Sequence, residues 1–267
     1  MKIVNHPSLS QIQDVYSGPE GDLWELIMGE QIHIGGFASS MKLAENAGIC
    51  EGMKGLDLCC CSGAGMRFLA RFKNVLSMKG VDATEKVIAR GIERNQKEGF
   101  KEKIDFVLAE ATHTGLPSEQ ADFVWGEDAW CYVENKKKLI EEAVRLVKPS
   151  GIIAFTDWVK GPKAIQENEL KRFNKFMKFP NILDIQGYKN LFEDNGCSII
   201  MAQDTGEFAS HVDLYLDMLN KQLTYDALKI INFDMDLLNG MAGEMVFMQS
   251  LAREGKIAQG MFIAKKK

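Results

Sequence analysis

The sequence has little of what several large protein classes require. Six prolines and four histidines occur among its 267 residues, and no apolar run approaches the roughly 18 residues of a membrane-spanning helix. Lys and Arg together number 32 against 37 Asp and Glu, so the formal net charge is −5. A nucleic-acid groove needs a basic face, whereas the chain end Lys265–Lys267 is a basic run of only three residues. We therefore expect neither a nucleic-acid partner nor a membrane span.

The start of the chain and its cysteines indicate the compartment. Residues 1–6 lack the long apolar run of a secretory signal, which predicts a cytoplasmic protein. Three of the six cysteines are consecutive, Cys59 to Cys61, a spacing typical of neither a disulfide framework nor a zinc site. We expect reduced thiols that pack as small apolar side chains, and no bound metal.

One stretch, Lys54–Ala70, is strongly patterned. It predicts a short buried strand over Leu56–Leu58, a turn of small residues over Cys59–Gly65, and a helix that begins near Met66. Small side chains let a ligand approach backbone N–H groups, and the first turn of the helix carries a partial positive charge. The stretch is typical of the first strand–turn–helix of a nucleotide-type binding domain.

The residues around this turn favour one cofactor over another. A dinucleotide site needs glycines where a pyrophosphate touches bare backbone, but Cys59 and Cys61 occupy the first two of those positions. Asp57, two residues before the turn, would repel a phosphate and attract the ammonium and sulfonium of S-adenosylmethionine. The pattern therefore favours S-adenosylmethionine. Because both cysteines carry a Cβ, we expect negative φ at both, with the side chains as thin walls beside the methionine moiety.

Strand and helix patterns alternate after the turn, which predicts an α/β fold with a parallel sheet and right-handed crossovers. Expected strands cover residues 74–81, 104–108, 123–125 and 152–156, and expected helices cover 84–96 and 136–147, the last stopped by Lys148–Gly151. Helices are then expected over 165–177, 185–194 and much of 210–257, with strands over 198–203 and 261–264.

The change of rhythm suggests four parts. We predict an N-terminal helical cap and cofactor lid over 1–50 and a Rossmann-like cofactor-binding core over 51–160. A substrate-selecting helical insertion with the sixth strand follows over 161–257, and the final strand and tail occupy 258–267.

Acidic residues follow three of the expected strands. Asp82 is placed to accept hydrogen bonds from ribose hydroxyls, or else to cap the next helix. Glu110 can accept the amino group of adenine. Glu127 and Asp128 lie beside Trp130 and Tyr132. Carboxylates next to aromatic side chains suit a substrate amine, through ion pairing and cation–π contact. The alternative is core packing for Trp130 and helix capping for Asp128.

Together, several segments resemble the class I S-adenosylmethionine-dependent methyltransferases of the sarcosine/dimethylglycine and phosphoethanolamine N-methyltransferase group. They are Trp24–Gly36, Gly55–Leu69, Asp122–Ala129, Leu146–Gly151, Thr156–Asp157 and Glu254–Gly260. The resemblance implies a Rossmann-like, seven-stranded, mostly parallel sheet flanked by helices, whose last strand is antiparallel. It also implies cofactor contacts at Gln31, Ile34, Gly35, Asp57, Cys59, Cys61, Asp82, Glu110, Ala111 and Glu127, with Gly63 and Ala83 beside them.

For the methyl acceptor, the resemblance points to Tyr16, Asp128 and Tyr132. In the phosphoethanolamine enzymes a tyrosine at the Tyr16 position pairs with a histidine, and Tyr132 stands at the histidine position here, so that dyad is broken. Asp128, Tyr16 and His33 are the candidate proton acceptors. His6, His113 and His211 are expected at the surface or in ordinary packing.

The acceptor pocket is expected to be apolar and to bind no phosphate. The positions that hold phosphate in the resembling enzymes align with Met177 and Phe179, and a phosphate without donors would be costly to bury. Trp130 and Trp158 are the other expected substrate-binding side chains.

We therefore predict methyl transfer from S-adenosylmethionine to a small-molecule amine of the glycine, sarcosine or dimethylglycine type, by in-line displacement, in a monomer or homodimer. Two alternatives stay open. An O-, S- or C-methyltransferase acting on an apolar or aromatic small molecule is favoured by the apolar pocket. A non-catalytic S-adenosylmethionine-binding protein is favoured by the Cys-for-Gly turn and by Tyr132.

Overall fold

A seven-stranded sheet forms the centre of the molecule. The computed structural model describes residues 7–267, so the expectation for His6 lies outside the described residues. The strands lie in the order β3-β2-β1-β4-β5-β7-β6. Their bounds are β1 Lys54–Leu58, β2 Ser77–Asp82, β3 Ile104–Leu108, β4 Ala121–Glu127, β5 Val147–Lys160, β6 Cys197–Asp204 and β7 Ile257–Lys266. β1 to β5 pair in parallel, and β7 runs antiparallel to both β5 and β6, which confirms the predicted fold class.

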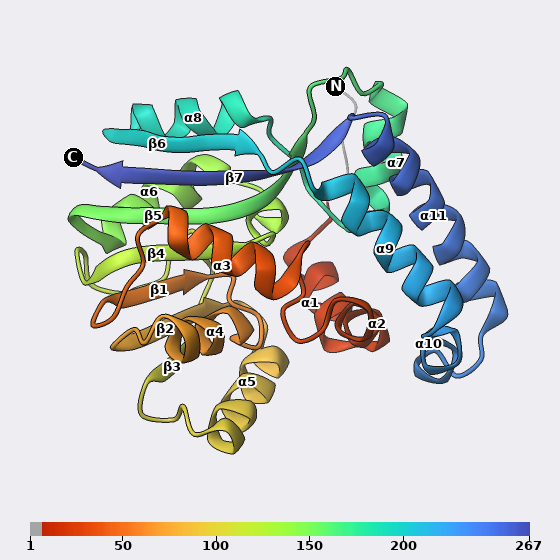
Figure 1. Cartoon of the computed structure of the whole chain (residues 1–267), viewed down its shortest axis with the longest axis horizontal. Helices are drawn as coiled ribbons and strands as arrows, with labels where there is room; N and C mark the ends of the chain where they lie inside the picture. Colours follow the sequence, from red (N-terminus) through yellow and green to blue (C-terminus); the bar gives the residue numbers. More distant parts are fainter. Residues whose placement is uncertain (1–6) are drawn as a thin grey trace.

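Helices cover both faces of this sheet and gather at one end of it. Figure 1 shows α1, α2 and the group α9 to α11 beyond the end toward which β1 runs. The bounds are α1 Leu9–Ser17, α2 Pro19–Met28, α3 Gly36–Asn46, α4 Ala64–Phe72, α5 Glu85–Glu98, α6 Lys136–Leu146, α7 Glu167–Met177, α8 Ile185–Asp194, α9 Phe208–Lys221, α10 Thr224–Ile230 and α11 Met235–Arg253. A short 3₁₀ helix, η1, covers Trp130–Tyr132.

The two faces of the sheet follow from alternation along its strands. Leu56 and Leu58 of β1 join one apolar cluster with side chains of α6 and α8. In β4, Val124 joins that cluster, whereas Phe123 and Trp125 point to the opposite face, where they meet α3 and α4. Successive side chains of a strand point to opposite faces, so a strand that is apolar along its length is covered on both sides.

A third apolar cluster lies at the end of the sheet rather than on a face. It is built mainly from α2, α7, α9 and α11, and it contains Trp24, Ile34, Trp158, Phe173, Met177, Phe179, Phe208, Tyr215 and Met245. This cluster joins the first helices of the chain to the last ones. It therefore forms a second packed unit against the carboxyl ends of the parallel strands.

Most predicted elements are present, with shifted ends. α4 begins at Ala64 rather than near Met66, because the left-handed Gly63 (φ +76°) directly precedes its first turn. The expected turn Lys148–Gly151 lies inside the span of β5, where Ser150 has φ +62°. β5 pairs with β4, and the register of this pair shifts between Ala121 and Phe123 of β4. The extra residues of β5 therefore form an irregularity in the ladder and not a separate loop.

Within residues 7–267, every helix is too short or too polar to cross a membrane.

Candidate active site

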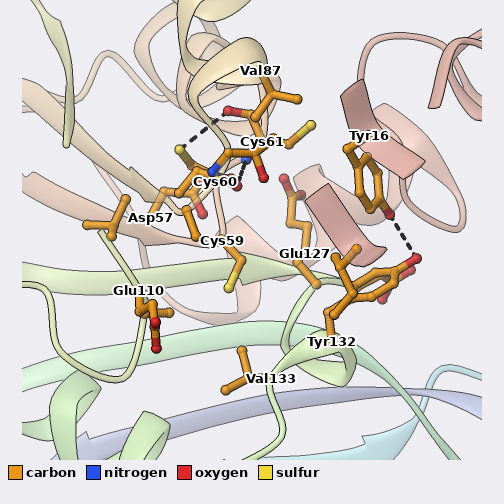
Figure 2. Close-up of a pocket in the computed structure, with 18 of the residues that line it drawn as sticks. Tyr16, Asp57, Cys59, Cys60, Cys61, Val87, Glu110, Glu127, Tyr132 and Val133 are labelled. Atoms are coloured by element: carbon orange, nitrogen blue, oxygen red, sulfur yellow. Dashed lines mark hydrogen bonds between the residues drawn. The ribbon is translucent and has the colours of Figure 1, made fainter. Parts of the chain in front are cut away.

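A cavity of about 430 Å³ opens at the carboxyl ends of β1, β2 and β4. In the strand order, β1 and β4 are the neighbours at which the direction of winding reverses, and such a switch point is where open α/β sheets bind ligands. Figure 2 shows Asp57 and the turn Cys59–Cys61 on one side of this cavity and Tyr16 with Tyr132 on the other. The cavity therefore brings together the first helix, the first strand and the segment after β4.

Thirteen sequence-predicted site residues line the cavity. They are Tyr16, Gln31, His33, Asp57, Cys59, Cys61, Asp82, Ala83, Glu110, Ala111, Glu127, Asp128 and Tyr132.

The backbone of the turn contradicts the expectation of negative φ at its cysteines. Cys59 has φ +63° and Cys61 has φ +48°, so both adopt the left-handed conformation that glycine adopts without strain. The prediction was wrong because contacts from β2 hold this turn. Cys60 N–H donates to Val81 O at 3.1 Å, and Cys61 N–H donates to Asp82 Oδ2 at 2.9 Å. The thiols still line the cavity, but their backbone is strained.

Asp82 organises the polar edge of the cavity. Its Oδ2 accepts from Cys61 N–H, and its Oδ1 accepts from Thr84 N–H at 2.8 Å, so it supports both the turn and the start of α5. Each oxygen keeps a second lone pair. Burial raises the pKa of Asp82, while the N–H groups of Thr84 and Cys61 oppose that rise.

Asp57 is a buried carboxylate that the protein leaves unpaired. Its side chain is 4% exposed, it lines the cavity, and it accepts no hydrogen bond from any residue in 7–267. Burial, together with the charges of Glu127 and Asp82, raises its pKa well above the usual value. Gln31 Oε1 is a second buried acceptor that has no partner within the described chain. The Asp57 carboxylate faces the cavity, where a ligand can supply the donor or cation that it needs.

The charged residues of the cavity lining are mostly acidic. Lys138 is its one lysine or arginine among the described residues, and its acids are Glu30, Asp57, Asp82, Glu110, Glu127, Asp128 and Glu134. A cavity lined in this way attracts cations and repels phosphate.

Ser40 connects the segment before α3 to the end of β4. Its Oγ accepts from Gln31 Nε2 at 2.8 Å and donates to Glu127 Oε1, and it lies 3.0 Å from His33 Nε2. His33 Nε2 also lies 3.3 Å from Glu127 Oε1. Gly65 makes room for this acid, because a Cβ there would stand 2.3 Å from Glu127 Oε2.

Asp128 holds the same segment from the other side. It follows β4 with φ +49°, and its Oδ2 accepts from Ile34 N–H at 2.8 Å. Gln259 Nε2 donates to both of its oxygens, at 3.0 Å to Oδ1 and 2.8 Å to Oδ2. Burial raises the pKa of Asp128, an effect opposed by the nearby His33 and by the Gln259 amide.

Tyr16 and Tyr132 close the cavity. The Tyr16 hydroxyl donates to the Tyr132 hydroxyl at 2.8 Å, and the rings meet edge to face, which joins α1 to η1 (Figure 2). A direct hydrogen bond therefore links these two positions although neither is a histidine. Burial raises the pKa of both phenols well above the usual value, so both are neutral near pH 7.

The expected substrate side chains lie outside the cavity. Trp130 is fully buried, stacks on Phe155 at 4.0 Å between ring centroids, and donates to Leu58 O. Trp158, Met177 and Phe179 belong to the apolar cluster at the end of the sheet. Phe179 approaches the site indirectly, through its edge contact with the Tyr132 ring at 4.8 Å. All four side chains are therefore part of the packed core. Because Trp130 does not line the cavity, the basis for a cation–π contact with a substrate there is removed.

Three predicted cofactor contacts also lie behind the lining. Ile34 is fully buried, Gly35 adjoins α3, and Gly63 supplies the left-handed cap of α4. The other two histidines are placed as expected, with His113 exposed and His211 one-quarter exposed on α9 beside Tyr215.

Ser40, Tyr215 and Gln259 contribute to the site but were not singled out from the sequence. Each lies inside a regular helix or strand and contacts residues far away along the chain, so no motif or spacing marks it. The six cysteines are all unpaired, and no cluster of three or more potential metal ligands occurs within residues 7–267.

Residues 56–155 match the methyltransferase domain family. Phosphoethanolamine N-methyltransferase 1 of Zea mays is 24% identical over 246 residues, which make up 91% of this chain and 47% of the maize protein. The chain thus spans about half the length of the plant relatives that it matches. Sterol-type C-methyltransferases are also among the similar proteins, over a shorter stretch.

Two of the many solved structures that share the fold are methyltransferases by name. Haemonchus contortus phosphoethanolamine N-methyltransferase 2, in complex with phosphomonomethylethanolamine and S-adenosylhomocysteine, superposes with a TM-score of 0.83 at 17% identity, over 95% of this chain and 58% of that one. A putative sarcosine dimethylglycine methyltransferase from Galdieria sulphuraria gives a TM-score of 0.75 at 22% identity, over 86% of this chain and 84% of that one.

Proposed function

We propose a methyl-transfer reaction for this chain, which belongs to the class I S-adenosylmethionine-dependent methyltransferases and is related to the phosphoethanolamine and sarcosine/dimethylglycine N-methyltransferases. In this proposal the chain binds S-adenosylmethionine in the cavity and transfers its methyl group to the nitrogen of a small amine. The acceptor is of the glycine, sarcosine or dimethylglycine type and carries no phosphate, and in this proposal Lys138 of the lining pairs with the carboxylate of that acceptor.

The unpaired carboxylate of Asp57 carries the proposal. A buried carboxylate without a partner is unfavourable until a cation arrives, and S-adenosylmethionine supplies an ammonium and an electrophilic sulfonium methyl. Gln31 also lines the cavity, and its Nε2 is held by the Ser40 hydroxyl. In this proposal Asp82 uses its free lone pairs to accept from the ribose hydroxyls, and Glu110 and Ala111, which line the same cavity, contact adenine. These residues fit the cofactor.

The acidic lining supports an amine as acceptor. Asp128 Oδ1 accepts one hydrogen bond, from Gln259, and so keeps a lone pair for an amine N–H. Its raised pKa makes Asp128 a better proton acceptor than an ordinary aspartate. The phenols of Tyr16 and Tyr132 are neutral, so in this proposal they donate hydrogen bonds and exclude water rather than act as bases.

A second candidate is methyl transfer to carbon in an apolar acceptor. Leu9, Ile12, Val133 and Pro180 give the cavity an apolar side, and C-methyltransferases are among the similar proteins. The acidic lining weighs against the binding of such an acceptor, because an uncharged apolar molecule is not attracted by the seven carboxylates.

Calorimetric titration with S-adenosylmethionine tests the cofactor assignment. We expect binding by the wild-type protein and affinity at least about tenfold weaker in Asp82→Ala, since the variant loses an acceptor for ribose and the support of the turn. Unchanged affinity in that variant would remove Asp82 from the site.

A panel of acceptors tests the reaction. Purified protein is incubated with S-adenosylmethionine and, separately, glycine, sarcosine, dimethylglycine, phosphoethanolamine and a sterol, and S-adenosylhomocysteine is quantified. We expect turnover with a phosphate-free amine and far less with phosphoethanolamine. Product with the sterol alone would support the C-methyl candidate, and cofactor binding without product from any acceptor would support a non-catalytic binding protein.

A further inference from the structure

Two residues of the segment before α3 are held by side chains from three separate elements. Ile34 N–H donates to Asp128 Oδ2 at 2.8 Å, and Ile34 O accepts from Gln259 Nε2 at 3.2 Å. Gly35 N–H donates to the Tyr215 hydroxyl at 2.9 Å. The partners come from the end of β4, from β7 and from α9, so this clamp joins the N-terminal part of the chain to its last strand.

Gln259 is the centre of the clamp. Its side chain is 1% exposed, and its amide nitrogen reaches Ile34 O and both oxygens of Asp128. An amide with two N–H groups can satisfy a carboxylate and a carbonyl at the same time. Neither Gln259 nor Tyr215 lines the cavity, so a ligand there would not touch them.

We propose that Gln259 is a positioning residue for the proposed methyl-transfer site, because it fixes Asp128 and the Ile34–Gly35 backbone and thereby places the side chains of the preceding loop around the cofactor. The inference rests on the proposed function.

The loop in question bears directly on the cavity. Glu30, Gln31, Ile32 and His33 all line it, and Ile34 follows them immediately. Gly35 has φ +85° and directly precedes α3, so the clamp acts at the point where the loop joins this helix. A loop that is already ordered binds its ligand more tightly, because less conformational entropy is lost on binding.

Three variants test the clamp by S-adenosylmethionine titration. Gln259→Leu keeps apolar volume but removes both N–H donors, and Tyr215→Phe removes one acceptor while keeping the ring. We expect affinity about tenfold weaker in Gln259→Leu and a smaller loss in Tyr215→Phe. Gln249→Leu is the matched control. Gln249 Nε2 also donates to a carboxylate, that of Asp213, at 2.7 Å, but Gln249 lies on α11 and is not part of the clamp. It should leave affinity unchanged.

Gln259→Glu separates positioning from a merely structural role. The new carboxyl would face Asp128, with His33, Asp157 and the Tyr215 hydroxyl as the other titratable groups around that carboxylate. Two adjacent buried carboxyls cannot both ionise easily, so a shared proton restores one O–H donor to Asp128 at low pH. We expect the affinity deficit of this variant relative to wild type to shrink between about pH 8 and about pH 5.5, while that of Gln259→Leu stays constant.

The outcomes distinguish this inference from the proposed function. If wild-type protein does not bind S-adenosylmethionine, the proposed function fails. If wild-type protein binds and the folded Gln259 variants bind equally well, the inference alone is overturned. A deficit in Gln259→Glu that does not change with pH would also overturn it, because the residue would then act only through general packing.

Discussion

At the residue scale, the turn Cys59–Cys61 shows where a pattern of residues is informative and where it is not. The pattern indicated a ligand-binding turn and its place in the chain. It did not indicate the backbone angles, because Val81 O and Asp82 Oδ2, from the next strand, decide them. The small side chains of the turn predict that a ligand can approach its backbone closely. The φ angles of the turn depend instead on hydrogen-bond partners more than twenty positions away.

The strain at Cys61 can be measured by substitution. Cys61→Gly should be more stable than Cys61→Ala by about 1 kcal/mol, because alanine keeps the cost of the left-handed conformation and glycine does not. Cys60→Gly and Cys60→Ala serve as the control pair, since Cys60 is not among the positive-φ residues and should show the reverse order. Denaturant unfolding gives both differences. The same order at both positions would contradict the strain.

Asp57 should make the stability of the ligand-free protein depend on pH. Its pKa in the folded protein is raised, so the folded state holds this proton more tightly than the unfolded state, and that contribution is lost as pH rises through the raised pKa. Asp57→Asn should therefore be more stable than wild type by about 1–2 kcal/mol near pH 8, with the difference vanishing toward about pH 4. It should also bind S-adenosylmethionine more weakly. Unfolding curves across pH check this, and a pH-independent difference would contradict it.

At the element scale, the sequence was most informative about local periodicity and least about which helices meet. The spans of β3 and α8 were predicted as observed, because their apolar patterns are strong and their ends are marked. The expected substrate side chains were misplaced for a related reason. Trp158 and Phe179 belong to elements that pack together as an apolar cluster at the end of the sheet. The periodicity of apolar residues is the same whether that face packs in the core or lines a pocket.

The hydrogen bond between α1 and η1 should act as a gate over the cavity. Tyr16→Phe and Tyr132→Phe each remove the same hydroxyl–hydroxyl bond, so each should speed cofactor dissociation, by about threefold to tenfold. The double variant should be little worse than either single one, because the bond can be lost only once. Stopped-flow dissociation rates from the four proteins form the cycle, and fully additive effects would show that the two hydroxyls act independently.

At the scale of the whole molecule, the site is assembled from both ends of the chain. The strand order and the antiparallel β7 were predicted through resemblance, not from periodicity. Gln259 and Asp128 are 131 positions apart, and Gly35 and Tyr215 are 180 apart. Contacts over such separations leave no trace in local spacing, which is why the acidic residues at strand ends were found from the sequence and the residues that hold them were not.

The summed charge of the cavity should distinguish S-adenosylmethionine from S-adenosylhomocysteine, which lacks the sulfonium and so carries one positive charge fewer. Raising ionic strength from about 0.02 M to about 0.3 M shortens the Debye length to roughly 5 Å, which screens the more distant carboxylates but not a close contact with Asp57. We expect the preference for S-adenosylmethionine to fall by about twofold to threefold over this range. Calorimetric titration of both ligands at each salt concentration measures this preference.

Glu134, an exposed acid in the lining, provides the matched variant. Glu134→Gln removes one screened charge, so it should flatten the salt dependence while leaving affinity at high salt unchanged. Equal salt dependence for the two ligands would mean that Asp57 alone, and not the field of the acidic lining, selects the cation.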